Sequence, residues 1–267
     1  MQPKAEENIL NQIAEKTIER VASYKEKVSL EEMKARARAL NPDTGFPFEN
    51  ALRKDNVSFI CEIKKASPSK GIIAADFPFL SIAKQYERAG ADAISVLTEP
   101  YWFLGNDSYL TQVQQNVTIP VLRKDFTVDE YMIYQAKVLG ADAVLLIVSL
   151  LSDEQLAEYL DIADELGLSA LTECHEETEI EKAIGLGARM IGVNNRNLKN
   201  FSVDPLNALT LRDKVPLGLL FVSESGISER SQVKALEDAG VNAVLVGETL
   251  MRSDNKKLCL RQLRGLD

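Results

Sequence analysis

Short apolar runs rich in β-branched residues alternate with amphipathic segments along most of the chain. The runs have the length and composition of strands, and the segments between them repeat apolar residues at helical spacing. The predicted strands are 58–63, 93–97, 119–123, 143–147, 169–173, 190–194, 219–223 and 243–246. The predicted helices are 80–88, 107–115, 128–139, 153–166, 177–186, 204–212, 228–239 and 256–266. Such regular alternation predicts a parallel sheet.

An internal repeat decides between an open sheet and a closed barrel. Four copies of one short pattern carry glycines that are 50, 47 and 53 residues apart, namely Gly90, Gly140, Gly187 and Gly240. Each glycine stands where a helix ends and the next strand begins, a position that favours positive φ. A period of this length corresponds to two βα units, and a propeller repeat would lack the helices. We therefore predict an α/β fold, a (βα)8 TIM barrel.

The first 50 residues precede this alternation and have a different pattern. Ile9 and Ile13 belong to a helical stripe, and Ser29 with Glu32 has the form of a capping box before a second short helix. The segment is too small and too polar to hold a core alone. We expect one barrel domain over 1–267, with 1–50 as a helical N-terminal extension and 51–267 as the barrel.

Composition narrows the classes of partner. Of the 267 residues 45% are hydrophobic and 27% are charged, and the formal net charge is −9, which argues against a general nucleic-acid or anionic-membrane binder. No signal peptide is evident, and the longest apolar run is far too short to span a bilayer. Cys61, Cys174 and Cys259 show no CxxC spacing, which favours reduced thiols in a cytoplasmic protein.

Polar side chains collect at the carboxyl ends of the predicted strands, where (βα)8 barrels place their active sites. Six of the eight strands end in groups suited to chemistry, among them Glu62, Lys64, Lys124, Glu173, His175, Asn194, Arg196, Glu224 and Glu248. The alternative for the first two is a solvated salt bridge at a strand tip, which would leave the other strand ends unexplained. We predict one active site at this end of the barrel.

The last two loops indicate a phosphate site. Ser225 and Gly226 follow the seventh strand, and Gly247 follows the eighth, just before a predicted short helix at 248–252. Backbone N–H groups at such positions bind anions, and glycine permits a close approach. The alternative is two ordinary turns. Glu248 would repel a dianion, so we expect its side chain to turn away.

The remaining residues suggest proton transfer. Lys64 and Lys124 bring two ammonium groups to one pocket, and we expect repulsion and partial desolvation to lower at least one pKa. A lysine so tuned can protonate a carbonyl oxygen, and Glu62 and Glu173 are carboxylates able to act as acid or base.

Two further residues are weaker candidates. His175, the one histidine, has no spaced partner for a metal site, and strand alternation predicts that it points away from Glu173. Trp102, in the loop after the second strand, is a candidate for covering an apolar ligand face, with plain packing as the alternative.

Taken together, these motifs resemble the indole-3-glycerol phosphate synthase family over about residues 45–252. The segments that carry the resemblance are Glu62-Ile-Lys-Lys-Ala-Ser-Pro-Ser-Lys-Gly71, Ser95-Val-Leu-Thr-Glu99 with Gly105, Pro120-Val-Leu-Arg-Lys-Asp-Phe126, Gly140-Ala-Asp-Ala-Val-Leu-Leu-Ile147, Thr172-Glu-Cys-His-Glu176, Gly192-Val-Asn-Asn-Arg-Asn-Leu198, Ser223-Glu-Ser-Gly-Ile227 and Leu245-Val-Gly-Glu-Thr-Leu-Met251. The family converts 1-(2-carboxyphenylamino)-1-deoxyribulose 5-phosphate to indole-3-glycerol phosphate, with release of CO2 and water and without a cofactor. The resemblance implies this lyase activity in tryptophan biosynthesis.

The resemblance also implies roles for the candidate residues. Lys124 would be the general acid that protonates the substrate ketone, and Glu173 would transfer protons during ring closure and dehydration. Lys64 would contact the substrate carboxylate and phosphate and is a candidate acid for dehydration. Glu62 and Asn194 would hold the sugar hydroxyls and the lysines in place, and Glu224 would support the central hydrogen bonds. Arg196 would bind the anthranilate carboxylate, and Phe126, with Trp102 or Phe103, would line the aromatic pocket. The residues that would bind phosphate are Ser67, Ser225, Gly226 and Gly247.

Departures from the family pattern lie at Cys174 and in the loop around Trp102, and they bear on loop packing and turnover. Two rival functions are phosphoribosylanthranilate isomerase and a barrel that binds a sugar phosphate without turnover. The isomerase relies on a cysteine and aspartate pair, whereas Cys61 should point away from Glu62. The non-catalytic barrel would lack Lys124 or Glu173. We expect a monomer whose partner is a small phosphorylated substrate, with no metal and no cofactor.

Overall fold

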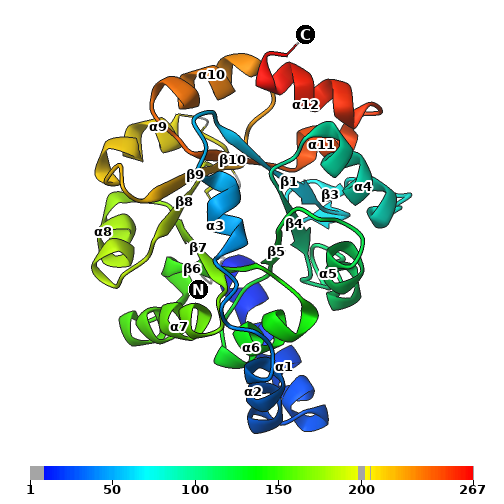
Figure 1. The fold of residues 1–267 in the computed structure, drawn as a ribbon, viewed down its shortest axis with the longest axis vertical. Coiled ribbons are helices and arrows are strands. Elements are labelled where there is room, and N and C mark those ends of the chain that lie inside the picture. The colour runs from blue at the N-terminus through cyan, green and yellow to red at the C-terminus, as the bar shows by residue number, and fades with distance from the viewer. Residues whose placement is uncertain (1–8, 198–201, 205, 267) are drawn as a thin grey trace, which may run out of the picture.

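The computed structural model describes residues 9–197, 202–204 and 206–266. Within these ranges, eight parallel strands close into a barrel that helices surround (Figure 1). The strands are β1 (Ser58–Ile63), β4 (Ala93–Leu97), β5 (Val121–Lys124), β6 (Ala143–Ile147), β7 (Ser169–Cys174), β8 (Met190–Asn194), β9 (Leu220–Glu224) and β10 (Ala243–Val246). Because β1 pairs with both β4 and β10, the sheet closes, and the predicted TIM barrel is confirmed.

The helices follow the strands as the alternation predicts. They are α4 (Phe79–Ala89), α5 (Asp107–Gln114), α6 (Glu130–Leu139), α7 (Asp153–Glu165), α8 (Glu177–Gly185), α9 (Asn207–Leu211), α10 (Arg230–Asp238), α11 (Glu248–Arg252) and α12 (Lys256–Arg264), with short 3-10 helices η1 (Val148–Leu150) and η2 (Arg212–Lys214). Gly90 (φ 92°) and Gly140 (φ 89°) end α4 and α6 in the left-handed conformation, as the repeat predicts. The predicted boundaries agree with the observed ones within three residues.

Two small features lie outside the predicted elements. A hairpin of β2 (Ala66–Ser67) and β3 (Gly71–Ile72) forms in the loop after β1. The sequence did not predict it, because each strand is too short to show a period of apolar residues. A third N-terminal helix, α3 (Pro47–Leu52), follows α1 (Ile9–Lys27) and α2 (Leu30–Arg38). Of the predicted segments, residues 1–8, Leu198 and Pro205 lie outside the described residues.

The N-terminal helices contribute to the barrel's inner core at both of its ends. Ile13 of α1 and Phe48 and Leu52 of α3 are buried in the same apolar cluster as the inward-facing strand residues. Helix α3 ends shortly before β1 begins, so it lies at the amino-terminal ends of the strands (Figure 1). Helix α1 reaches the opposite end, where its apolar residues line a cavity.

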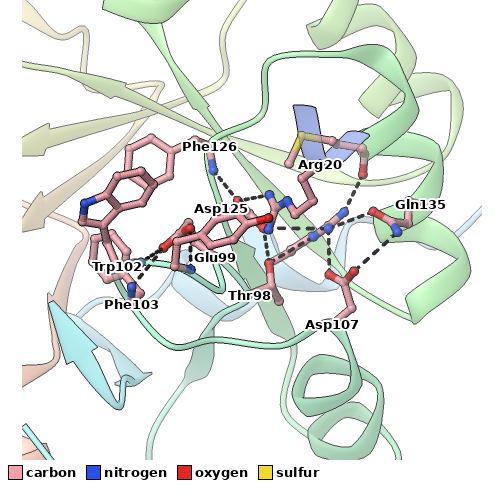
Figure 2. Close-up of polar contacts among 12 residues, drawn as sticks. Arg20, Thr98, Glu99, Trp102, Phe103, Asp107, Asp125, Phe126 and Gln135 are labelled. Atoms are coloured by element: carbon pink, nitrogen blue, oxygen red, sulfur yellow. Dashed lines mark hydrogen bonds and ion pairs between the residues drawn. The ribbon is translucent and has the colours of Figure 1, made fainter. Parts of the chain in front are cut away.

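A buried ion pair fastens α1 to the barrel. Nη2 of Arg20 lies 2.8 Å from Oδ1 of Asp125, and the two side chains are 4% and 1% exposed. Asp125 also accepts hydrogen bonds from the Thr98 hydroxyl (2.5 Å) and from the backbone N–H of Phe126 (2.8 Å). The network continues from Thr98 through Arg123, which contacts Asp107 and Gln135 (Figure 2). It lies directly behind the end of β5, and therefore fixes the backbone that follows Lys124.

Candidate active site

A cavity of about 620 Å³ opens at the carboxyl ends of the strands. It brings together all twelve residues predicted for the site, which are Glu62, Lys64, Ser67, Lys124, Phe126, Glu173, Asn194, Arg196, Glu224, Ser225, Gly226 and Gly247. Sequence reasoning missed one wall, which Ile9, Leu10 and Ile13 of α1 provide. The helical stripe through Ile9 and Ile13 was the available signal, but a stripe of this kind indicates packing before it indicates a ligand.

Lys124 lines the cavity and lies between two carboxylates. Its Nζ lies 2.9 Å from Oε2 of Glu173 and 2.7 Å from Oε2 of Glu224. Burial lowers the pKa of Lys124, but the negative charges of Glu173, Glu224 and Glu62 outweigh burial and raise this pKa above its ordinary value. The expectation that repulsion between the lysines lowers this pKa is therefore wrong for Lys124, because carboxylates contact its ammonium directly.

The two carboxylates that hold Lys124 differ in proton affinity. Burial and the neighbouring charge of Glu173 raise the pKa of Glu224 to about 7, although Lys124 opposes the shift. Burial raises the pKa of Glu173, but Lys124, His175 and a hydrogen bond from Asn194 (3.0 Å) outweigh burial and bring this pKa below the ordinary value. Carboxyl groups whose environments push their pKa values apart are suited to exchanging protons with a substrate at neutral pH.

His175 contacts Glu173, contrary to the prediction from strand alternation. Strand β7 ends at Cys174, so alternation does not extend to the next side chain. Nε2 of His175 lies 3.5 Å from Oε1 of Glu173, and Nδ1 lies 3.4 Å from Oε2 of Glu179. Burial lowers the pKa of His175, but the two glutamates prevail and raise it. The imidazole and the Glu173 carboxylate thus each favour the charged form of the other.

Small residues and hydroxyls line the side of the cavity predicted to hold phosphate. Ser225 and Gly226 both have positive φ (65° and 78°), which turns the chain sharply after β9. Gly247 precedes α11, and a Cβ at this position would collide with Oε1 of Glu62. Glu248 lines the cavity, but its carboxylate forms an ion pair with Arg252 at 3.0 Å.

The opposite wall is apolar. The rings of Phe103 and Phe126 lie 5.9 Å apart, centroid to centroid, with their planes inclined by 41°. Both line the cavity together with Leu145 and Ile147. Trp102 is half-buried and packs against the inner core beside them (Figure 2). This packing favours the plainer of the two interpretations of Trp102.

The fold and the cavity define the class of protein, a (βα)8 barrel whose cavity gathers side chains suited to acid–base chemistry. Within the cavity, the Lys124 ammonium contacts two carboxylates of unequal proton affinity, Glu173 and Glu224. The particular family follows from comparison with known proteins. A family model described as "Indole-3-glycerol phosphate synthase" matches residues 10–263, and the chain belongs to this family.

Relatives and solved structures agree with this assignment. The chain is 54% identical over 257 residues to indole-3-glycerol phosphate synthase of Ruminiclostridium cellulolyticum, covering 96% of this chain and 99% of the relative. It is 52% identical over 269 residues to that of Lachnoclostridium phytofermentans, covering 97% and 99%. A solved structure of 3-hexulose-6-phosphate synthase from Salmonella typhimurium has a TM-score of 0.65 at 15% identity, covering 79% of this chain and 98% of that one. This last likeness supports the fold alone.

Family membership establishes the activity as indole-3-glycerol phosphate synthesis, a carboxy-lyase step of tryptophan biosynthesis with a phosphorylated small-molecule substrate. The described helices include none with the length and apolar character needed to cross a membrane. Across the described ranges, His, Cys, Asp and Glu side chains form no cluster of three or more that could hold a metal ion.

Proposed function

We propose that Lys124 is the general acid that starts the conversion of 1-(2-carboxyphenylamino)-1-deoxyribulose 5-phosphate. Its ammonium protonates the substrate ketone while the anthranilate ring carbon attacks the same carbonyl carbon. Loss of CO2 then restores the aromatic ring, and loss of water completes the pyrrole. The observation that carries this assignment is the contact of Nζ with both Glu173 and Glu224, which keeps Lys124 protonated, so that a proton is present where the ketone would bind.

The carboxylates complete the proton transfers. In this scheme Glu173 accepts a proton during ring closure and returns it to the departing hydroxyl, while Lys64, paired with Glu62, contacts the substrate and is a candidate acid for dehydration. Asn194 orients Glu173 through its 3.0 Å hydrogen bond. Glu224, whose pKa lies near neutrality, supports the hydrogen bonds around Lys124.

The two ends of the cavity divide the substrate between them. Ser67, Ser225, Gly226 and Gly247 line the end that would bind the phosphate. At the other end, Phe126 and Phe103 would enclose the benzene ring. Arg196, which also lines the cavity, would pair with the substrate carboxylate. Because one end of the cavity is polar and the other is apolar, the substrate would bind in one orientation.

Broader properties belong to the same proposal. We expect residues 1–267 to act as one barrel domain, as a monomer in the cytoplasm, and without a cofactor. The formal net charge of −9 favours a small-molecule partner over nucleic acid.

A fluorescence assay for the indole product tests the central role of Lys124. Lys124→Met keeps the side-chain length but removes the proton, and we expect kcat to fall by about 10²–10⁴-fold. The control is Lys137→Met, since Lys137 donates a hydrogen bond to the carbonyl of Asn41 far from the cavity. That control should retain kcat. Near-normal turnover by Lys124→Met would assign the acid to another residue.

A further inference from the structure

The loop between β4 and α5 is organised around a buried carboxylate that the mechanism does not use. Glu99 is fully buried, and Oε1 accepts the backbone N–H of Tyr101 at 2.8 Å. Its Oε2 accepts the N–H groups of Trp102 (2.8 Å) and Phe103 (2.9 Å), as Figure 2 shows. Among the described residues, no basic side chain forms an ion pair with Glu99. Burying a charge is costly, so three hydrogen bonds to one short segment indicate a specific demand on its shape.

The segment that Glu99 holds is strained. Leu104 has φ 53°, a left-handed conformation that non-glycine residues rarely adopt. The next residue, Gly105, donates a 2.7 Å hydrogen bond to the Glu99 carbonyl, and a Cβ there would collide with the carbonyl of Leu97. Strain of this kind persists only where surrounding contacts over-determine the backbone. The carboxylate of Glu99 supplies those contacts.

The result of the strained turn is the position of Phe103. Its N–H is held by Glu99, and its carbonyl accepts the N–H of Ala66 at 3.3 Å. With the peptide fixed at both ends, its ring faces Phe126 across the apolar wall of the cavity. Glu99 does not line the cavity, and of the three residues whose N–H groups it accepts, Phe103 is the one that does.

We infer that Glu99 is a positioning residue that holds Phe103 against Phe126 and thereby determines how tightly the aromatic end of the substrate binds. The inference rests on the proposed placement of the benzene ring at this wall. Because Glu99 acts through one side chain, its removal should weaken recognition of the aromatic end and leave the chemistry and the phosphate end unchanged.

Steady-state kinetics of three variants test this. Glu99→Gln puts an amide N–H₂ where one of the accepted N–H groups points, and we expect KM to rise roughly tenfold with kcat within about twofold of wild type. Phe103→Leu should raise KM by a similar factor. In the double variant the two effects should not multiply, so KM should stay within about twofold of Phe103→Leu alone.

Inhibition by inorganic phosphate supplies a readout that a general loss of structure would move. Its inhibition constant should be the same for Glu99→Gln and wild type. A parallel loss of phosphate binding, or multiplying effects in the double variant, would overturn the inference. An unchanged KM for Phe103→Leu would instead reject the proposed placement of the aromatic ring, and the role of Glu99 with it. A raised KM for Phe103→Leu beside an unchanged KM for Glu99→Gln would reject the role of Glu99 alone.

A second background keeps the test valid if Glu99→Gln folds poorly. Leu104→Gly removes the strain, because glycine adopts positive φ without steric cost. In that background Glu99→Gln should again raise KM, relative to Leu104→Gly alone, while phosphate inhibition stays constant. Equal KM values for the two would count against the inference.

Discussion

Replacing Arg20 by methionine should reveal how the N-terminal extension is held on the barrel. Methionine keeps most of the side-chain volume but leaves the Asp125 carboxylate buried without its closest cation. Breaking a buried pair of this kind costs about 3–5 kcal/mol. Asp125 keeps the Thr98 hydroxyl, the Phe126 N–H and, at 3.8 Å, Nη2 of Arg123, so we expect the low end of that range, about 3 kcal/mol.

Urea unfolding at neutral pH measures the loss. The matched control is Lys25→Met, since Lys25 joins the same helix to Asp129 at 2.7 Å, but with side chains that are 34% and 29% exposed. A partly exposed pair of this kind contributes at most about 1 kcal/mol. The two variants therefore remove pairs of similar length that differ mainly in burial.

Two results would refute this reasoning. Equal small losses for Arg20→Met and Lys25→Met would mean that α1 is held by apolar packing alone. The double variant Arg20→Met with Asp125→Asn provides the second, because neutralising the orphaned carboxylate should recover much of the loss. If the double variant were less stable than Arg20→Met alone, the unpaired charge would not be the cause.

Three further outcomes are expected. Folding raises the pKa of Glu224 from 4.5 to about 7, so the free energy of unfolding of the wild type should fall as pH rises between these two values. Glu224→Gln should abolish this fall, as measured by urea unfolding at several pH values. Gly247→Ala would force a Cβ against Glu62, and steady-state assays should show a raised KM and lowered kcat. Gly185→Ala, with open space around its Cβ and no positive φ, should raise the unfolding free energy by about 0.4–1 kcal/mol and leave kcat unchanged.

The barrel could be predicted because its signals are local and repeated. Each glycine such as Gly90 marks a helix end by its own backbone preference, and four copies fix the number of units. The gathering of Lys124 with Glu173 and Glu224 followed from strand order alone, since parallel strands bring their carboxyl ends to one face.

What the sequence left undetermined depends on geometry beyond the strand. The contact of His175 with Glu173 required knowing that β7 ends at Cys174. The raised pKa of Lys124 required knowing which charges touch it, because a second lysine in the same pocket predicts the opposite direction. The wall formed by Ile13 required the docking of α1, which the Arg20 ion pair helps to fix.

The pairing of β1 with β10 also bears on how the chain folds during synthesis. The first barrel strand to leave the ribosome gains its second partner only when the last has been made, so until then β1 and β9 are the open edges of an unclosed sheet. Such edges are sites for pairing between chains. Stalled chains that end before β10 should therefore be sensitive to proteases and prone to associate, whereas chains extended past α12 should resist digestion.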